Sequence, residues 1–427
     1  MAEHFDALVV GRSLAALLCA ALLAKRKIRV RLLVPDPPVP EPWPVPLMGL
    51  RVSPIVRRVL DELGLQHAVR TRLEGAPGGV GIALPDRRFT LEVDVRARGV
   101  ELGRVFPDQR AALLALFDRI EGYGGSLDVL LGGETPIPPV GFAERRQVRR
   151  ILADLPVAQL EQPQPPVPPQ LQGLLAALYA IVGRAENPTQ PLTAGAARSI
   201  FLLCDGLARF RQGPETFRGI VEEKLVTYGG QLELRRRAAR IEVGGKRARA
   251  VLTGDGHRIT ADAIVFGDDD TTLSRLCPET ALPTNALGGC AQIELPAGTL
   301  SPVMQALTGW QPTPESRGVL LRREKDTLTI GWPDGPAPDL LRLLPQLPAA
   351  PNLEPVRLAM APPAALGPDP LDLWRGDVVG PVRRLLRVGA AVLPGLGLEG
   401  EALTAWHAAR RAEAWTRGSS LWPFGRR

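Results

Sequence analysis

The hydrophobic pattern at the start of the chain predicts a βαβ unit. An apolar segment ends at Val9 and Val10, and Gly11 then permits a tight turn. Apolar residues next recur at helical spacing, at Leu14, Leu17, Leu18, Ala21 and Leu22. A second apolar segment closes at Val34. A strand that is apolar on both faces belongs inside a parallel sheet, so we expect an α/β fold with a Rossmann-like start.

The turn after the first strand departs from the G-x-G-x-x-G fingerprint of dinucleotide-binding proteins. Gly11 is kept, but the second and third glycine positions hold Ser13 and Ala16. The second glycine normally lets the backbone approach a pyrophosphate, and the Cβ of Ser13 points into that space. The serine hydroxyl is nevertheless able to donate to an anion at the helix N-terminus. The motif therefore indicates a Rossmann-type unit and leaves dinucleotide binding open, the alternative being a sheet core that has lost its cofactor.

The end of the second strand departs from the same fingerprint. Val34 stands where an acidic residue would hold the ribose hydroxyls, and Asp36 lies two residues later. The proline-dense stretch 35–46 follows and predicts an extended loop. A turn in that loop would let Asp36 take the place of the missing acid.

The next segments interrupt a simple doubly wound pattern. "SPIVRRVLDELGLQHAV" predicts a helix, "GGVGIALPDRRFTLEVD" two strands, and "FPDQRAALLALFDRIEGY" another amphipathic helix. Residues 140–200 are mostly helical in pattern, apart from the proline-rich loop "EQPQPPVPPQ". This order predicts a second domain inserted into the first.

Two later segments return to the pattern of a nucleotide domain. Alternating strands after residue 205 end in an apolar run, 263–266, followed by Gly267 and three aspartates, 268–270. Near the C-terminus, "LLRVGAAVLPGLGLEGEALTAWHAARRAEAW" predicts a strand, a glycine-rich turn and a helix. The turn contains Pro394-Gly395, Gly397 and Gly400.

In this order, the segments resemble the phytoene desaturase and amine oxidase group of flavoproteins. The resemblance implies a flavin domain built from residues 1–75, 205–275 and 380–415, with a substrate domain in 76–204 and 276–379 and a tail in 416–427. It implies FAD as cofactor, with hydride transfer from an apolar isoprenoid- or lipid-like substrate to the flavin. The residues it assigns to the cofactor are Gly11, Ser13, Leu14, Ala16, Asp36, Gly389, Gly395, Gly397 and Gly400.

The chain also departs from this group at the phosphate end of the site. The group carries a Gly-Gly-Arg element after the second strand, where this chain has its prolines and then Leu47-Met48-Gly49. With Ser13 and Val34, three FAD contacts are altered, whereas the flavin-ring end around Gly389 to Gly400 is kept. Two hypotheses follow: an FAD-dependent oxidoreductase, or a flavin-free member of the fold that binds a lipid or a protein.

Composition adds little to this picture. The net charge of +7 comes from arginine, and we expect no nucleic acid partner. The four cysteines, Cys19, Cys204, Cys277 and Cys290, are widely spaced, which argues against a zinc site and fits reduced cytoplasmic thiols. We expect the four histidines to be surface or cap residues and no catalytic acid or base to stand out. No segment is long and apolar enough to predict a transmembrane helix.

The C-terminal tail is the one segment that suggests a membrane contact. "EAWTRGSSLWPFGRR" interleaves tryptophan and phenylalanine with arginine, a combination suited to a membrane interface. The alternative is a tail whose aromatic side chains pack on the protein itself.

Overall fold

The structure is a computed structural model, and it describes residues 3–35, 47–75, 79–83, 88–156, 169–182, 192–213, 215–280, 288–294, 309–311, 319–324, 327–332, 356–358, 373 and 378–418.

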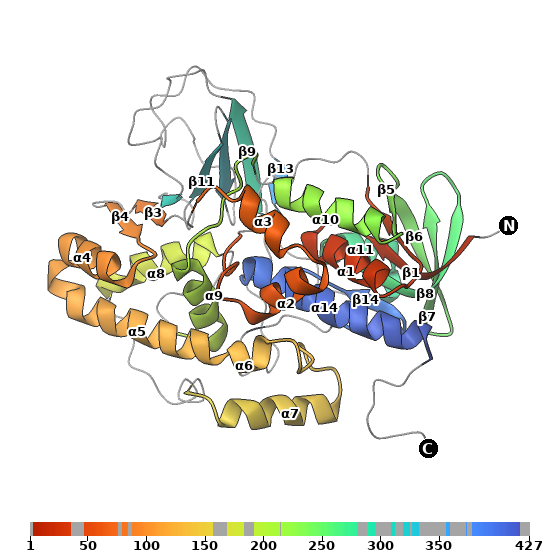
Figure 1. The fold of residues 1–427 in the computed structure, drawn as a ribbon, viewed down its shortest axis with the longest axis horizontal. Helices are drawn as coiled ribbons and strands as arrows, with labels where there is room; N and C mark the ends of the chain where they lie inside the picture. The colour runs from red at the N-terminus through yellow and green to blue at the C-terminus, as the bar shows by residue number, and fades with distance from the viewer. Residues whose placement is uncertain are drawn as a thin grey trace.

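A seven-stranded sheet organises one half of the molecule (Figure 1). Its path runs β5–β2–β1–β8–β7–β6, and β14 also pairs with β8. The strands are β1 (Glu3–Val10), β2 (Val30–Leu33), β5 (Gln231–Glu233), β6 (Ala238–Gly244), β7 (Arg247–Thr253), β8 (Arg258–Phe266) and β14 (Leu385–Arg387). The pairs among β5, β2, β1, β8 and β14 are parallel, and β6–β7–β8 is antiparallel. The sheet therefore joins segments from the start, middle and end of the chain.

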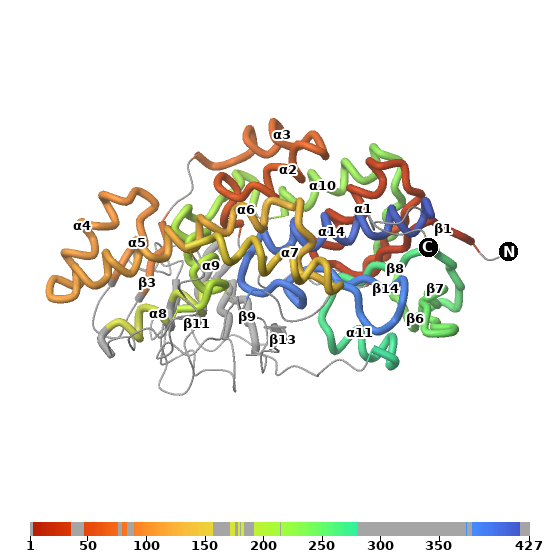
Figure 2. Tube along the Cα trace, turned by 90° about the horizontal axis from the view of Figure 1, so that it is seen from below, coloured from red at the N-terminus to blue at the C-terminus, as the bar shows by residue number. Residues whose placement is uncertain are grey.

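The central strand β1 is buried on both faces, as its apolar pattern predicts. Ala7 and Val9 belong to a core shared with α1 (Leu14–Lys25), α10 (Glu215–Thr227) and α14 (Gly397–Thr416). Phe5, Leu8 and Val10 belong to a second core shared with α11 (Asp270–Leu276). Alternate residues of a strand face opposite sides of a sheet, which is why Ala7 and Val9 face one core while Leu8 and Val10 face the other. Figures 1 and 2 show α1 (red) and α14 (blue) side by side.

The rest of the described chain is mainly helical. Its helices are α2 (Pro54–Glu62), α3 (Gln66–Arg72), α4 (Val95–Val105), α5 (Arg110–Ser126), α6 (Asp128–Leu131), α7 (Phe142–Ala153), α8 (Pro169–Ile181) and α9 (Ala194–Cys204), with short 3₁₀ turns at Pro107–Gln109 and Pro278–Thr280. An antiparallel pair is formed by β3 (Val80–Ala83) and β4 (Arg88–Leu91). A five-stranded antiparallel sheet, in the order β10–β11–β12–β9–β13, contains Gly309–Gln311, Val319–Glu324, Thr327–Trp332, Gly288–Glu294 and Val356–Leu358.

Local sequence signals account for most of these elements. The expected helix after Ser53 is α2, where the Ser53 hydroxyl oxygen accepts a hydrogen bond from the amide of Val56, and the expected strand pair is β3–β4. The pattern did not predict α4, which contains Gly99 and Gly103. This helix begins because the Asp94 side chain accepts a hydrogen bond from the amide of Ala97, a capping signal that its glycines obscured.

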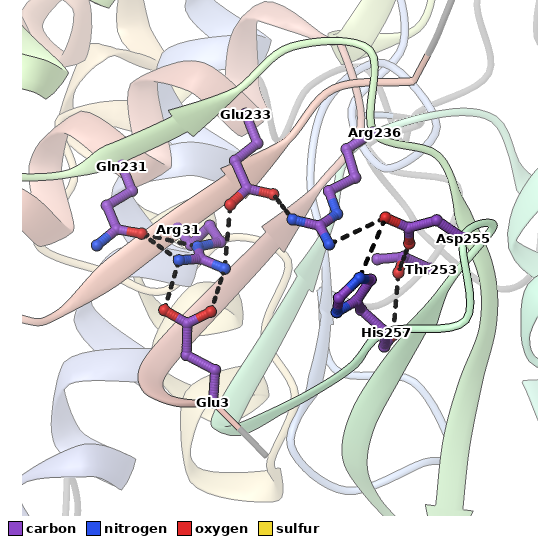
Figure 3. A network of polar contacts seen from close by, with 8 residues as sticks. All are labelled: Glu3, Arg31, Gln231, Glu233, Arg236, Thr253, Asp255 and His257. Carbon is purple, nitrogen blue, oxygen red and sulfur yellow. Dashed lines mark hydrogen bonds and ion pairs between the residues drawn. The ribbon is translucent and has the colours of Figure 1, made fainter. Parts of the chain in front are cut away.

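A network of charged side chains ties together three strands of the large sheet (Figure 3). Arg31 of β2 is only 6% exposed, and its guanidinium donates to Glu3 of β1 at 2.6 Å and lies 3.0 Å from Glu233 of β5. Arg236 continues the network by pairing with Glu233 and with Asp255. Each guanidinium has carboxylate partners, so we interpret this network as a structural link between neighbouring strands.

Candidate cofactor site

The turn between β1 and α1 begins at a position that only glycine fits well. Gly11 has φ of +129°, and a Cβ placed on it would lie 2.6 Å from the carbonyl oxygen of Gly267. The helix then starts with Ser13 as its N-cap, because the Ser13 hydroxyl oxygen accepts a hydrogen bond from the amide of Ala16 at 3.1 Å. Ser13 thus uses its side chain to cap α1.

Two further glycines meet this helix end at the carboxyl edge of the parallel strands. Gly267 follows β8, and a Cβ there would lie 2.6 Å from the Cβ of Ala16 and 2.7 Å from Oγ of Ser13. Gly389 follows β14 and has φ of +93°, and a Cβ there would lie 3.5 Å from Oγ of Ser13. The structure therefore brings Gly11, Ser13, Ala16 and Gly389 together from the two ends of the chain, with Leu14 buried in the first turn of α1.

The C-terminal motif forms a turn and a helix, with one difference from the expected boundary. Gly395 lies in the turn with φ of +76°, but α14 already begins at Gly397, so Gly397 and Gly400 belong to its first turn. A Cβ on Gly400 would lie 2.8 Å from the carbonyl oxygen of Leu393, so glycine lets the helix pack against the turn that precedes it. The hydroxyl oxygen of Thr404, one turn on, accepts a hydrogen bond from the amide of Gly389 at 2.9 Å.

The ribose end of the expected site is only partly described. Asp36 lies outside the described residues. Val34 is buried, and its amide donates to the carbonyl oxygen of Glu233 on β5 at 2.9 Å. The position that usually carries the ribose-binding acid therefore extends the pairing of β2 with β5.

Sequence reasoning missed the residue that contacts the helix end most directly. Glu401 of α14 is 3% exposed, and its Oε2 accepts a hydrogen bond from the amide of Ala15 at 2.6 Å. The only signal for it in the sequence is a lone acidic residue in the otherwise small and apolar stretch "GEALTAW". No local pattern shows that this side chain reaches a helix at the other end of the chain.

Asp268 is the second acidic residue beside the same turn. Its Oδ1 accepts a hydrogen bond from the amide of Arg12 at 3.2 Å and lies 3.9 Å from the guanidinium Nε of Arg12. Burial raises the pKa of Asp268 to about 6, and the contacts with Arg12 only partly offset this. Arg218 of α10 donates to the carbonyl oxygen of Arg12 and adds a positive charge nearby.

The histidines and cysteines add no second site in the described part of the chain. The expectation of surface histidines is wrong for His407, which is 3% exposed on α14, and burial lowers its pKa to about 3. Cys19, Cys204 and Cys277 are buried free thiols. Within the described ranges, no group of three histidine, cysteine, aspartate or glutamate side chains is placed to hold a metal ion, and no helix is long and apolar enough to cross a membrane.

Solved structures with a similar fold exist, although the sequence itself matches no known family model and no curated protein sequence. An oxidoreductase from Methanosarcina mazei is 15% identical, with a TM-score of 0.52 over 93% of this chain and 98% of the other. A Pyrococcus furiosus protein is 14% identical, with a TM-score of 0.52 over 98% and 99% of the two chains. A Thermoplasma acidophilum protein, described as geranylgeranyl bacteriochlorophyll reductase-like, is 11% identical, with a TM-score of 0.50 over 97% and 79%.

This chain shares its α/β fold with these proteins, one of which is described as an oxidoreductase and one as reductase-like. At these identities the likeness concerns the fold alone, so the fit of a dinucleotide rests on the residues of this chain. The backbone arrangement fits, because the N-terminus of α1 lies at the carboxyl edge of the sheet beside Gly389, whereas the Cβ positions of Gly11 and Gly267 are filled by atoms of the chain. The side chain of Glu401 does not fit a bound pyrophosphate in its present position, since its carboxylate already accepts a hydrogen bond from the amide of Ala15 at that helix end.

Proposed function

We propose that this protein is an FAD-dependent oxidoreductase of the desaturase or dehydrogenase type, acting on an apolar isoprenoid- or lipid-like substrate. The observation that carries the proposal is the meeting of the β1–α1 turn, Gly267 and the β14–α14 turn at one edge of a parallel sheet. Ligands of open α/β sheets bind outside the carboxyl ends of the strands. A protein of similar fold, described as geranylgeranyl bacteriochlorophyll reductase-like, supports the substrate class, because a geranylgeranyl chain is an isoprenoid.

The proposed site has one end for the pyrophosphate and one for the flavin ring, and different residues would line each end. The N-terminus of α1, with Ser13 and Ala16, would face the pyrophosphate, and Gly389 lies beside Ser13 at the same end. Gly395, Gly397 and Gly400 would lie towards the flavin ring. The chemistry that FAD would supply when bound is acceptance of a hydride. The backbone amides and the positive end of α14 would favour negative charge near its N-terminus. The chain itself would supply mainly binding and orientation.

Reconstitution with FAD tests this proposal. We expect the purified protein to acquire the visible absorbance of bound flavin when it is incubated with FAD and passed through a desalting column. Riboflavin, which lacks the pyrophosphate and adenosine, is the control and is expected to be removed by the column. A preparation that is colourless as purified and that FAD does not reconstitute would overturn the proposal in favour of a flavin-free binding protein.

A further inference from the structure

The N-terminus of α1 already has a negatively charged partner from within the chain. Glu401 is almost completely buried, and its carboxylate oxygen lies 2.6 Å from the amide nitrogen of Ala15. The first turn of α1 contains no acidic residue of its own, so Glu401 supplies the charge that the helix end favours.

Glu401 occupies the space that Gly389 leaves open. A Cβ placed on Gly389 would lie 3.3 Å from Oε1 and 3.6 Å from Oε2 of Glu401, and 3.5 Å from Oγ of Ser13. The carboxylate therefore lies between the β14–α14 turn and the first turn of α1. In a dinucleotide-binding Rossmann fold this is the side of the helix end on which a pyrophosphate binds.

Three other backbone amides around this turn also have acceptors within the chain. The amide of Arg12 donates to Asp268, that of Ser13 to the carbonyl oxygen of Gly267, and that of Ala16 to the Ser13 hydroxyl oxygen. With Ala15, four of the amides in residues 12–16 donate to acceptors of the chain itself. An incoming pyrophosphate would meet filled donors and a carboxylate of the same charge sign.

We propose that Glu401 determines how tightly this site holds a dinucleotide, by occupying the anion position at the N-terminus of α1. The Glu401 carboxylate has to leave the amide of Ala15 before a pyrophosphate binds there. Glu401 is thus an affinity- and specificity-determining residue of the site. This inference rests on the proposed function, in that it concerns the site assigned to FAD.

Inorganic pyrophosphate is the probe that tests the anion position directly. In Glu401→Gln the charge is removed, while a side-chain oxygen remains to accept from Ala15 and keep the helix end capped. We expect pyrophosphate to raise the melting temperature of Glu401→Gln and to leave that of the unaltered protein unchanged. Glu223→Gln is the matched control, because Glu223 is exposed on α10 and the same charge is removed away from the site. Equal responses of the Glu401→Gln variant, the control and the unaltered protein would overturn the inference.

FAD titration then separates this inference from the proposed function. We expect Glu401→Gln to bind FAD about tenfold more tightly than the unaltered protein, measured from the change in flavin fluorescence. FAD binding of equal affinity by both proteins would overturn the role of Glu401 and leave the proposed function standing. If neither protein binds FAD but pyrophosphate protects only Glu401→Gln, the proposed function fails and the role of Glu401 in excluding anions is supported.

Discussion

At the scale of single residues, the fold disfavours the charged form of Asp268, which lies beside the candidate cofactor site. It follows Gly267 at the end of β8, and 16% of its side chain is exposed. Burial is the largest influence on its pKa and raises it by favouring the neutral carboxyl group, while the amide and the charge of Arg12 act in the opposite direction. The residue therefore links the stability of this turn to pH.

The pKa of Asp268 predicts how stability changes with pH. The folded protein binds the proton more tightly than the unfolded chain, since the pKa rises from 3.8 to about 6. The stabilisation is complete below the unfolded pKa and is lost as the pH rises through about 6. Relative to Asp268→Asn, the unaltered protein is expected to lose up to about 3 kcal/mol of unfolding free energy between about pH 4 and about pH 7.

Urea denaturation of both proteins at the two pH values measures this difference. Asp61→Asn is the control, because Asp61 is exposed on α2 and its replacement tests the general effect of removing a charge. A difference between the unaltered protein and Asp268→Asn that is the same at both pH values would contradict the assigned burial of Asp268.

At the scale of secondary-structure elements, a buried ion pair joins α14 to the helical part of the molecule. Arg198 of α9 and Glu399 of α14 are both fully buried, and Nε of Arg198 donates to Oε2 of Glu399 at 2.8 Å. Arg198 also donates to the carbonyl oxygen of Gly124 on α5 and lies 2.7 Å from Asp128. Arg198 thus connects the first turn of α14 to α9, which carries it, and to α5 and α6.

Breaking this ion pair is expected to destabilise the protein strongly. Glu399→Gln leaves the buried charge of Arg198 without its buried counter-ion, which is expected to cost about 3–5 kcal/mol of unfolding free energy in urea denaturation. The double variant Arg198→Met with Glu399→Met removes both charges and is expected to recover most of that loss. A double variant as unstable as Glu399→Gln would show that the packing of these side chains, rather than their charge, holds the helices together.

At the scale of the whole molecule, the C-terminal tail is the segment on which a membrane contact would depend. Trp415, the first aromatic residue of the tail pattern, is partly buried and packs against the main core through α14. The remaining aromatic residues, Trp422 and Phe424, lie outside the described residues.

The apolar substrate proposed above leads us to propose peripheral membrane contact through this tail as well. We expect the full-length protein to co-sediment with vesicles containing anionic lipid, and more weakly with neutral vesicles, because arginine and aromatic side chains are interleaved in residues 417–427. A chain ending at Arg417 is expected to stay in the supernatant. Equal sedimentation of the two chains, or none of either, would exclude the tail as the membrane contact.

The sequence by itself determined the local elements of this protein. Apolar spacing predicted the strand that ends at Val10, the helix from Leu14 and the C-terminal helix. Gly11 predicted a tight turn after the strand, and its φ is positive in the structure. These features depend on neighbours within a few residues, because strand and helix periodicity and turn conformation are local properties of the chain. The resemblance to flavoproteins predicted the Rossmann-type fold from the same local segments.

Only the tertiary structure decided which side chains meet at the site. The parallel pairing of β1 with β8, and of β8 with β14, brings Asp268 and Gly389 to the first turn of α1. The packing of α14 against α1 then places Glu401 on the amide of Ala15. The sequence shows Glu401 only as one of three acidic residues in the C-terminal helix. Its partner is determined by sheet register and by helix packing between distant segments. The sequence contained Gly389, which leaves room for an anion beside α1, whereas the fold determined that the Glu401 carboxylate occupies that room.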